Sequence, residues 1–427
     1  MNKRNNTRKV MVGNVQIGGQ NKVVIQSMTN TKTHDVESTL TQINQLYQEG
    51  CEIIRIAVLG KDDAAVLKTI VERSPCPLVA DIHFNYEFAL IAADSGISKI
   101  RINPGNIGSI ENTKKVVEKC LEKKIPIRIG VNSGSLPLDL VNKYGWTPKA
   151  MIESARRHIE ILEHLGFYDI ILSLKATEPL MAIEAYTLAS QEWNYPLHLG
   201  ITEAGSHHTG TIKSCSGLSP LLFNGIGDTI RISLSTDPIA EVEVAKRMLN
   251  SLGLYDNIVD VIACPTCGRL EYDLFPVVKE LEEYTKALKI PLKIAILGCV
   301  VNGPGEAKQA DLGIAGGKNG GIIFKKGKIY KSCKQEELVP ELKLLIDEYY
   351  QEWQQKTFSN NKTFYDKIKS GKKIEVNDMN MCCPAKNHDC FSCRTCSKPK
   401  VGCRSCLICI SCTDCVNKKC EYCKNKR

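Results

Sequence analysis

Short apolar runs alternate with amphipathic stretches from Val23 to about Asn250. The runs are rich in Val and Ile, which is typical of strands buried on both faces of a parallel sheet. Eight such runs predict eight strands: Val23–Met28, Ile53–Val58, Leu78–Asp81, Lys99–Ile102, Ile127–Val131, Ile170–Leu174, Leu197–Ile201 and Thr229–Ile232.

The stretches between the strands carry apolar residues at helical spacing. Clear examples are Val36–Gln48, Asp62–Glu72, Asn112–Glu122, Met151–Leu165 and Ile239–Leu252. Eight βα units within about 230 residues favour a closed (βα)8 TIM barrel over an open doubly wound sheet. We therefore expect residues 1–252 to form an α/β barrel.

A smaller α+β domain is predicted for residues 253–350, with residues 351–380 as a Lys/Asn-rich linker and residues 381–427 as a Cys-rich tail. In the smaller domain we expect short strands within residues 312–331 and four longer elements: strands Ile258–Ala263 and Leu292–Leu297, and helices Tyr272–Leu288 and Glu336–Tyr350.

The chain has 20 cysteines, and twelve of them lie beyond Asn380. A disulfide scaffold is disfavoured because the chain is long and its N-terminus shows no secretory signal. No run approaches the roughly 18 apolar residues of a membrane span. We therefore expect a soluble, cytoplasmic protein that uses cysteine for metal or cluster ligation.

The formal net charge of +9 arises entirely after residue 350, where sixteen Lys/Arg face seven Asp/Glu. The preceding part carries forty residues of each sign. A basic nucleic-acid-binding face across the whole protein is therefore not indicated, and any charge-driven partner would have to meet the tail.

Charged and polar residues close the predicted strands, where the chemistry of a barrel takes place. Four arginines and one lysine would converge there, which suits the binding of two phosphates. The alternative is that single strand-end charges are solvated rim residues. The residues are Arg55, Asp81, His83, Arg101, Asn103, Arg128, Asn132, Lys175, Glu203, Arg231 and Ser233.

Three of these features leave their roles open. Glu203 is either a counter-ion for an arginine or an acid/base group. His83 suits hydrogen-bonded positioning better than metal ligation. Glycines in 104–106, 133–135 and 204–205 would let backbone N–H groups approach phosphate oxygens, although turns need glycine in any case.

The smaller domain carries two cysteine motifs, each directly after a predicted strand: Cys264–Arg269 and Gly298–Glu306. Structural zinc needs four Cys or His ligands, and only three cysteines are at hand, namely Cys264, Cys267 and Cys299. Three thiolates with a labile fourth position suit a [4Fe-4S] cluster. Glu306 is favoured for that position over Cys333 because it shares the loop of Cys299.

Together with Arg101–Gly108 and Gly225–Arg231, these motifs make the chain resemble the bacterial 4-hydroxy-3-methylbut-2-enyl diphosphate synthases over about residues 5–350. The resemblance implies reductive ring opening and dehydroxylation of 2-C-methyl-D-erythritol 2,4-cyclodiphosphate in the MEP pathway, with flavodoxin or ferredoxin as electron donor. It also implies a homodimer in which the cluster domain of one chain closes over the barrel of the other.

The resemblance further implies one [4Fe-4S] cluster per chain, held by Cys264, Cys267, Cys299 and a Glu306 that substrate displaces. Glu203 would stabilise charge or supply a proton. The diphosphate would be held by Arg55, Arg101, Arg128, Lys175 and Arg231, with His83, Asn103, Asn132 and Ser233 beside it.

The tail departs from this family, because Cys-x-x-Cys steps recur within 382–423 with few apolar residues between them. Additional metal is expected there ahead of an electron-relay role, and a low-complexity extension stays open. Two rival functions are a zinc-stabilised nucleic-acid binder acting through the tail and a pure electron carrier. Neither explains the barrel.

Overall fold

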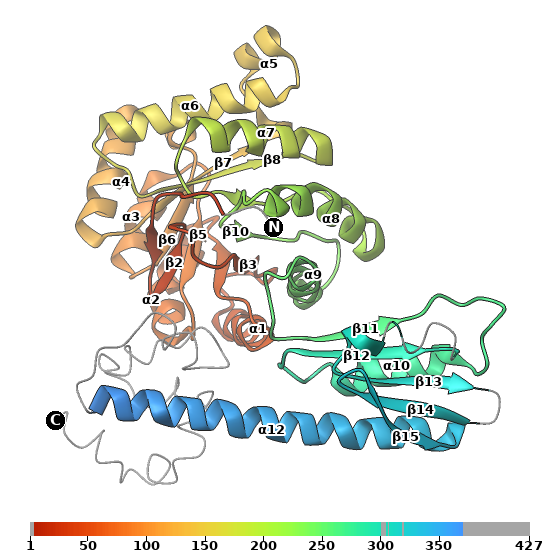
Figure 1. Ribbon diagram of the computed structural model, residues 1–427. Coiled ribbons are helices and arrows are strands. Elements are labelled where there is room, and N and C mark those ends of the chain that lie inside the picture. Colours follow the sequence, from red (N-terminus) through yellow and green to blue (C-terminus); the bar gives the residue numbers. More distant parts are fainter. Residues whose placement is uncertain (1–3, 300–304, 306, 318–319, 370–427) are drawn as a thin grey trace. The chain divides into compact units, whose positions relative to one another are not determined.

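A computed structural model of the chain describes residues 4–299, 305, 307–317 and 320–369 (Figure 1). The chain divides into two compact units, Met1–Leu254 and Tyr255–Arg427. Among the described residues, no helix is both long and apolar enough to cross a membrane.

Eight parallel strands form the first unit, in the order β8-β7-β6-β5-β4-β3-β10-β9. A parallel bridge between Leu172 and Leu197 brings β8 next to β9, so the ring is nearly closed. The predicted TIM barrel is thereby confirmed. The strands are β3 (Val24–Met28), β4 (Ile53–Ala57), β5 (Leu78–Asp81), β6 (Lys99–Ile102), β7 (Ile127–Asn132), β8 (Ile170–Lys175), β9 (His198–Leu199) and β10 (Thr229–Ile230).

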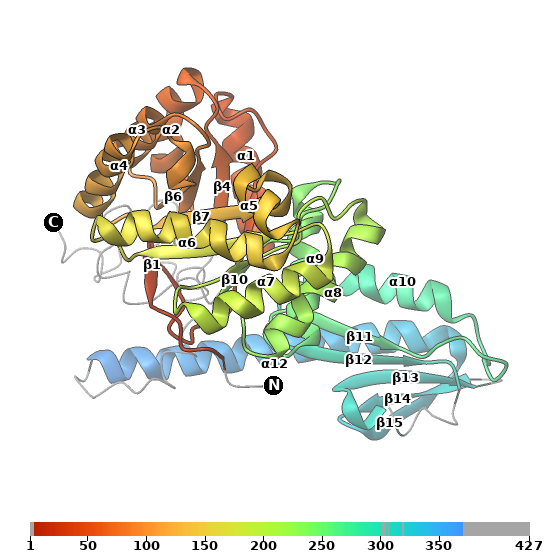
Figure 2. The same ribbon diagram turned by 90° about the horizontal axis from the view of Figure 1, so that it is seen from above.

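Nine helices of this unit are described: a short one, α5 (Leu138–Tyr144), precedes α6, and the other eight alternate with the strands. Figure 2 shows the helices around the barrel. Side chains of Asp35, Asn85, Ser109, Thr147 and Asp237 accept backbone N–H bonds at five helix starts, which satisfies donors that the first turn leaves unpaired. The helices that alternate with the strands are α1 (Val36–Glu49), α2 (Lys61–Arg73), α3 (Tyr86–Asp94), α4 (Ile110–Lys123), α6 (Pro148–His164), α7 (Pro179–Glu192), α8 (His207–Phe223) and α9 (Pro238–Ser251).

A hairpin of β1 (Val10–Val12) and β2 (Val15–Ile17) precedes the barrel and was not predicted. Its Val10, Val12 and Ile17 are buried against residues at the amino-terminal ends of barrel strands, including Val24 and Ile53. The hairpin therefore covers the end of the barrel opposite the expected site. Strands of three residues are too short to leave a periodic pattern.

The second unit is a five-stranded sheet in the order β11-β12-β13-β14-β15. The first three strands are parallel, and β14 is antiparallel to both of its neighbours. Its elements are β11 (Val259–Ala263), α10 (Leu274–Thr285), β12 (Leu292–Leu297), β13 (Leu312–Gly317), β14 (Gly320–Lys325), β15 (Lys328–Cys333) and α12 (Gln335–Lys369).

The last helix corrects the expected linker. We expected a helix ending at Tyr350, but α12 continues to Lys369, so residues 351–369 are helical. The weak periodicity beyond Tyr350 misled the prediction, because a helix ends at breakers, and neither Gly nor Pro occurs between Glu341 and Ser370. The Cys-rich tail lies outside the described residues.

Candidate active site

The predicted cations lie inside the barrel. Lys175 closes β8, whereas Arg55, Arg101 and Arg128 lie within their strands. Arg55, Arg101, Arg128 and Lys175 are each at most 8% exposed, on β4, β6, β7 and β8. Their apolar neighbours along the strands, such as Ile54 and Ile100, are fully buried. Strand alternation explains this, since inward cations alternate with outward apolar residues packed under the helices.

Asp81 joins three of the predicted site residues at the end of β5. Its carboxylate lies 3.6 Å from Arg55 Nε and 3.2 Å from Arg101 Nη1, and its Oδ1 lies 3.7 Å from Nε2 of His83. Burial would raise the pKa of this carboxyl, but Arg55, His83 and Arg101 lower the pKa well below its ordinary range. Asp81 therefore stays ionised and anchors two of the arginines.

Burial disfavours the charged forms of Arg128 and Lys175. Nε and Nη1 of Arg128 are buried with no hydrogen-bond partner among the described residues. Burial, followed by Arg55 and Arg101, lowers the pKa of Arg128 well below its ordinary value. Burial and the neighbouring arginines lower the pKa of Lys175 in the same way. An anion bound between these groups would relieve both penalties.

Glycines at two interior positions make room for the cations. A Cβ at Gly130 would lie 2.9 Å from Nε of Arg101, and a Cβ at Gly200 would lie 2.6 Å from Nζ of Lys175. Only glycine leaves both groups in place without a shift.

Glu241 is a site residue that the sequence interpretation missed. Its carboxylate lies 3.7 Å from Arg231 Nε and accepts from the hydroxyl of Ser27 at 3.2 Å and from the N–H of Leu234 at 2.9 Å. Burial raises the pKa of Glu241, although Arg231 opposes this. The available signal was an acidic residue on the apolar stripe of α9, one turn before the buried Ala245.

A deeper polar group inside the barrel was also missed. Lys99 is fully buried and donates to Gln26 Oε1 at 2.9 Å, while burial lowers its pKa. Fully buried His198 contacts the hydroxyl of Thr229, and its pKa is likewise lowered by burial and then by Arg128. Lys99 closes no strand, so attention to strand ends could not single it out.

The remaining predicted barrel residues lie at the same end but make different contacts. Asn103 Oδ1 accepts from the N–H of Gly130 at 2.9 Å, which ties β6 to β7. Asn132 closes β7, and Ser233 lies just beyond β10; both are partly buried.

Glu203 stands apart from the cations. It is exposed, has a φ of +52°, and accepts a hydrogen bond of 3.4 Å from the Thr177 hydroxyl. Among the described residues it forms no ion pair with an arginine, so the counter-ion interpretation has no support in the structure. Its strained backbone holds the carboxylate at the rim of the mouth.

Two cysteines of the second unit lie on neighbouring turns. Cys264 follows β11, and Cys299 follows β12, which is the parallel neighbour of β11. The N–H of Gly298 donates to Cys264 Sγ at 3.1 Å. Hydrogen bonds from Arg269 lower the pKa of the exposed Cys267 thiol, which favours the thiolate that metals bind.

These thiols fit a soft metal by their chemistry, but the described residues contain no group of three or more His, Cys, Asp or Glu close enough to hold one. Glu306 lies outside the described residues. Cys333 closes β15, three strands away from β12, which is about 14 Å at the usual spacing of strands. That distance disfavours Cys333 as a ligand shared with Cys299.

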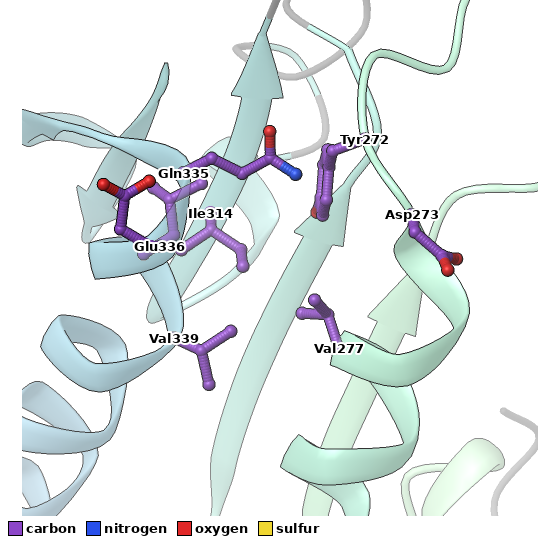
Figure 3. A pocket seen from close by; sticks show the side chains of 8 residues that line it. Tyr272, Asp273, Val277, Ile314, Gln335, Glu336 and Val339 are labelled. Carbon is purple, nitrogen blue, oxygen red and sulfur yellow. The ribbon is translucent and has the colours of Figure 1, made fainter. Parts of the chain in front are cut away.

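A cleft of about 310 Å³ opens beside this edge of the sheet, between the starts of α10 and α12 (Figure 3). Tyr272 forms one wall, and its hydroxyl donates to the carbonyl of Leu297 at 3.2 Å. The tyrosine ring packs on Gly316, where a Cβ would lie 2.0 Å from a ring carbon. These contacts of Tyr272 hold in place the chain that follows the Cys264–Arg269 motif.

Two family models cover most of the chain. The model described as the GcpE TIM-barrel domain matches residues 7–246, and that of the GcpE protein C-terminal domain matches residues 260–348. The chain belongs to the GcpE family. The GcpE barrel domain therefore corresponds to the barrel seen here, and the C-terminal domain to the unit with the cysteine motifs.

Several curated proteins that this GcpE chain is similar to carry the name 4-hydroxy-3-methylbut-2-en-1-yl diphosphate synthase (flavodoxin). The protein from Malacoplasma penetrans is 59% identical over 350 residues, covering 82% of this chain and 97% of its own. The protein from Caldanaerobacter subterraneus is 55% identical over 347 residues, covering 81% and 98%. None of these matches indicates a nucleic-acid-binding protein.

Among solved structures, the chain is similar to the dihydropteroate synthase of Yersinia pestis, at 13% identity and a TM-score of 0.42, covering 57% of this chain and 98% of that one. A likeness at this level supports no conclusion about the GcpE chain.

Proposed function

We propose that the five cations inside the barrel hold the two phosphates of 2-C-methyl-D-erythritol 2,4-cyclodiphosphate. The chain catalyses the reductive ring opening and dehydroxylation of this compound to 4-hydroxy-3-methylbut-2-enyl diphosphate in the MEP isoprenoid pathway, as an oxidoreductase of the GcpE family. The observation that carries the proposal is the excess of positive charge: among the described residues, Arg55, Arg101, Arg128, Lys175 and Arg231 share two carboxylates of the site, Asp81 and Glu241.

The cations act by holding the substrate in one orientation. Arginine forks bind phosphate oxygens in pairs, and a dry interior strengthens each such contact. A bound anion would stabilise Arg128 and Lys175, since burial disfavours the charged form of each and Arg128 leaves two nitrogens without a partner among the described residues. His83, Asn103, Asn132 and Ser233 lie at the same end of the barrel and orient the rest of the molecule.

Glu203 acts on the departing hydroxyl. The reaction takes up two electrons, breaks a carbon–oxygen bond of the ring, and releases a hydroxyl that needs a proton to leave as water. The exposed Glu203 side chain at the rim would deliver that proton as a carboxylic acid, or stabilise the charge that forms.

One [4Fe-4S] cluster per chain is held by Cys264, Cys267, Cys299 and Glu306. The donor chemistry supports this set, because the Cys267 thiol tends to ionise and a backbone N–H already faces the sulfur of Cys264. When bound, such a cluster supplies single electrons and a Lewis-acidic iron. Flavodoxin is the electron donor, because the names of the relatives include flavodoxin; ferredoxin is the alternative.

A homodimer covers the mouth of the barrel with the cysteine-bearing unit of a second copy. Support comes from an apolar rim around the mouth of the barrel. One large apolar side chain follows each of the strands β4 to β8, and each of these side chains is at least 70% exposed. Exposed apolar side chains gathered around a site mark a contact surface. The rim consists of Leu59, Phe84, Ile110, Leu138 and Leu180.

The state of the cysteines supports a cytoplasmic location. All eight cysteines of the described residues are unbridged, as expected in a reducing compartment. The extra metal expected within residues 382–423 would be a surplus over the cluster.

The test is anaerobic purification of the full chain, with iron, sulfide and zinc analysis, absorption spectra with and without the cyclodiphosphate, and turnover with reduced flavodoxin. We expect at least four irons per chain, a spectrum that the substrate perturbs, and the linear diphosphate as product. A chain that binds iron but neither binds nor converts the cyclodiphosphate would overturn the proposal.

A further inference from the structure

Met28 lies between two of the cations that are proposed to hold substrate. It closes β3, which pairs with β4 on one side and β10 on the other. Its register partner on β4 is Arg55, and Arg231 directly follows β10. Met28 is partly exposed at the end of the barrel where the cations gather.

The thioether accepts from both arginines. Nε of Arg55 lies 3.1 Å from Sδ of Met28, and Nη1 of Arg231 lies 3.7 Å from the same sulfur. A thioether sulfur is a weak, neutral acceptor that meets donors on two sides at once. One side chain therefore fixes the direction in which two guanidinium groups point.

Each of these arginines also lies near one carboxylate of the site. Asp81 lies 3.6 Å from Arg55 Nε, and Glu241 lies 3.7 Å from Arg231 Nε. Burial lowers the pKa of Arg55 to about 10, and the charge of Arg231 contributes to that shift. The two positive charges thus repel one another, and Met28, which is neutral, contacts both groups.

We infer that Met28 is a positioning residue that sets the orientation of Arg55 and Arg231 toward one phosphate group. A carboxylate at this position would neutralise both cations and compete with phosphate. An aliphatic side chain would fill the space but leave the two arginines without a shared acceptor. This inference rests on the proposed function, since it assigns the phosphate to these arginines.

The test compares the full-length wild type with Met28→Leu, Met28→Gln and the control Met151→Leu, which changes a fully buried methionine on α6. Calorimetry measures binding of the cyclodiphosphate to oxidised protein, where no turnover occurs. Kinetics with reduced flavodoxin give KM and kcat separately, and thermal melting reports on folding. Leucine preserves the volume of methionine, so melting temperatures within about 3 °C of wild type are expected.

We expect Met28→Leu to weaken binding and to raise KM about fivefold to tenfold, with kcat changed less than twofold. The reason is that the variant loses the acceptor of hydrogen bonds from two charged arginines. Met28→Gln restores an acceptor of similar length and should recover at least half of the lost affinity on a logarithmic scale. Met151→Leu should bind like wild type.

The outcomes separate the two proposals. If wild type does not bind the cyclodiphosphate, the proposed function fails whatever Met28 does. If wild type binds and Met28→Leu binds equally well, the positioning role of Met28 is overturned. Equal weakening in the Leu and Gln variants would also overturn it, since the loss would then follow packing rather than the acceptor.

Discussion

Nδ1 of His158 accepts a hydrogen bond from the backbone N–H of Gly105 at 3.1 Å, across 53 residues of sequence. His158 lies on α6 and Gly105 on the turn after β6. A Cβ at Gly105 would lie 2.9 Å from a ring carbon of His158, so glycine is needed here for the approach of an imidazole. This N–H is therefore engaged by protein, whereas the sequence suggested that it would face phosphate.

His158 should make stability depend on pH in a defined window. Burial, followed by Arg157, lowers the pKa of His158 from the ordinary 6.5 to about 4. Between these values the unfolded chain binds more protons, so the free energy of unfolding falls as the pH drops from 6.5 toward 4, by about 3 kcal/mol. In His158→Gln this contribution should vanish, since an amide oxygen can accept from Gly105 without titrating.

Urea unfolding at several pH values between 7 and 4 measures the effect. Carboxylates titrate in both proteins and cancel in the difference. Parallel curves for wild type and His158→Gln would show that the imidazole is not held neutral by the fold.

Arg128→Met should stabilise the protein and abolish tight substrate binding. Arg128 is 2% exposed and leaves two nitrogens without a partner among the described residues. A buried charge of this kind costs stability, so an apolar side chain of similar length should raise the free energy of unfolding by about 2 kcal/mol. Loss of its phosphate contacts should weaken cyclodiphosphate binding about 100-fold. Denaturation measures the free energy of unfolding, and calorimetry on the same preparation measures the affinity for the cyclodiphosphate. A destabilised variant would mean that Arg128 is a structural residue.

Gly200→Ala should displace Lys175. The new Cβ would lie 2.6 Å from Nζ of Lys175 and 3.0 Å from the carbonyl oxygen of Arg231. Because the lysine end is flexible, it should move away, and cyclodiphosphate binding should weaken about tenfold. Gly60→Ala is the matched control, since a Cβ there meets nothing within 4 Å. Equal affinities of the two variants would argue that Lys175 does not contact the ligand.

Cys264→Ser and Cys333→Ser should differ in iron content. Cys264 follows β11 next to the turn of Cys299, whereas Cys333 closes β15 three strands from β12. Loss of the first thiolate should remove most of the cluster iron, and loss of the second should remove none. Metal bound by the tail is the same in both variants and therefore cancels. Cluster loss in Cys333→Ser would restore it as a ligand.

The barrel was predictable because each strand leaves a local signature. Runs such as Leu78–Asp81 and Lys99–Ile102 match the observed strands residue for residue. Apolar residues define the first run, and in the second two isoleucines alternate with two buried cations, which is the period of a strand. The predicted end of the last helix, Tyr350, was wrong. Its apolar periodicity fades beyond that residue, but neither Gly nor Pro between Glu341 and Ser370 ends the helix. The hairpin β1–β2 was missed because three-residue strands carry no pattern.

The barrel topology explains why the cations lie together. Parallel strands in a closed ring bring their carboxyl ends to one mouth, so a residue that closes a strand lies near that mouth. This rule applies directly to Lys175, which closes β8, whereas Arg55, Arg101 and Arg128 lie within their strands and reach the site because their side chains face the interior. Their roles toward substrate stay proposals.

The sequence by itself determined the eight βα units, the residues that close the strands and the cysteine motifs after β11 and β12, because each is written in a short stretch of chain. Only the tertiary structure decided which groups face them. Three examples are the contact of Glu241 with Ser27 and the contacts of Met28 and His158. In each case the partner lies on another element and is far away in the sequence. Contacts of that kind leave no local pattern, because they depend on how strands and helices far apart in sequence pack.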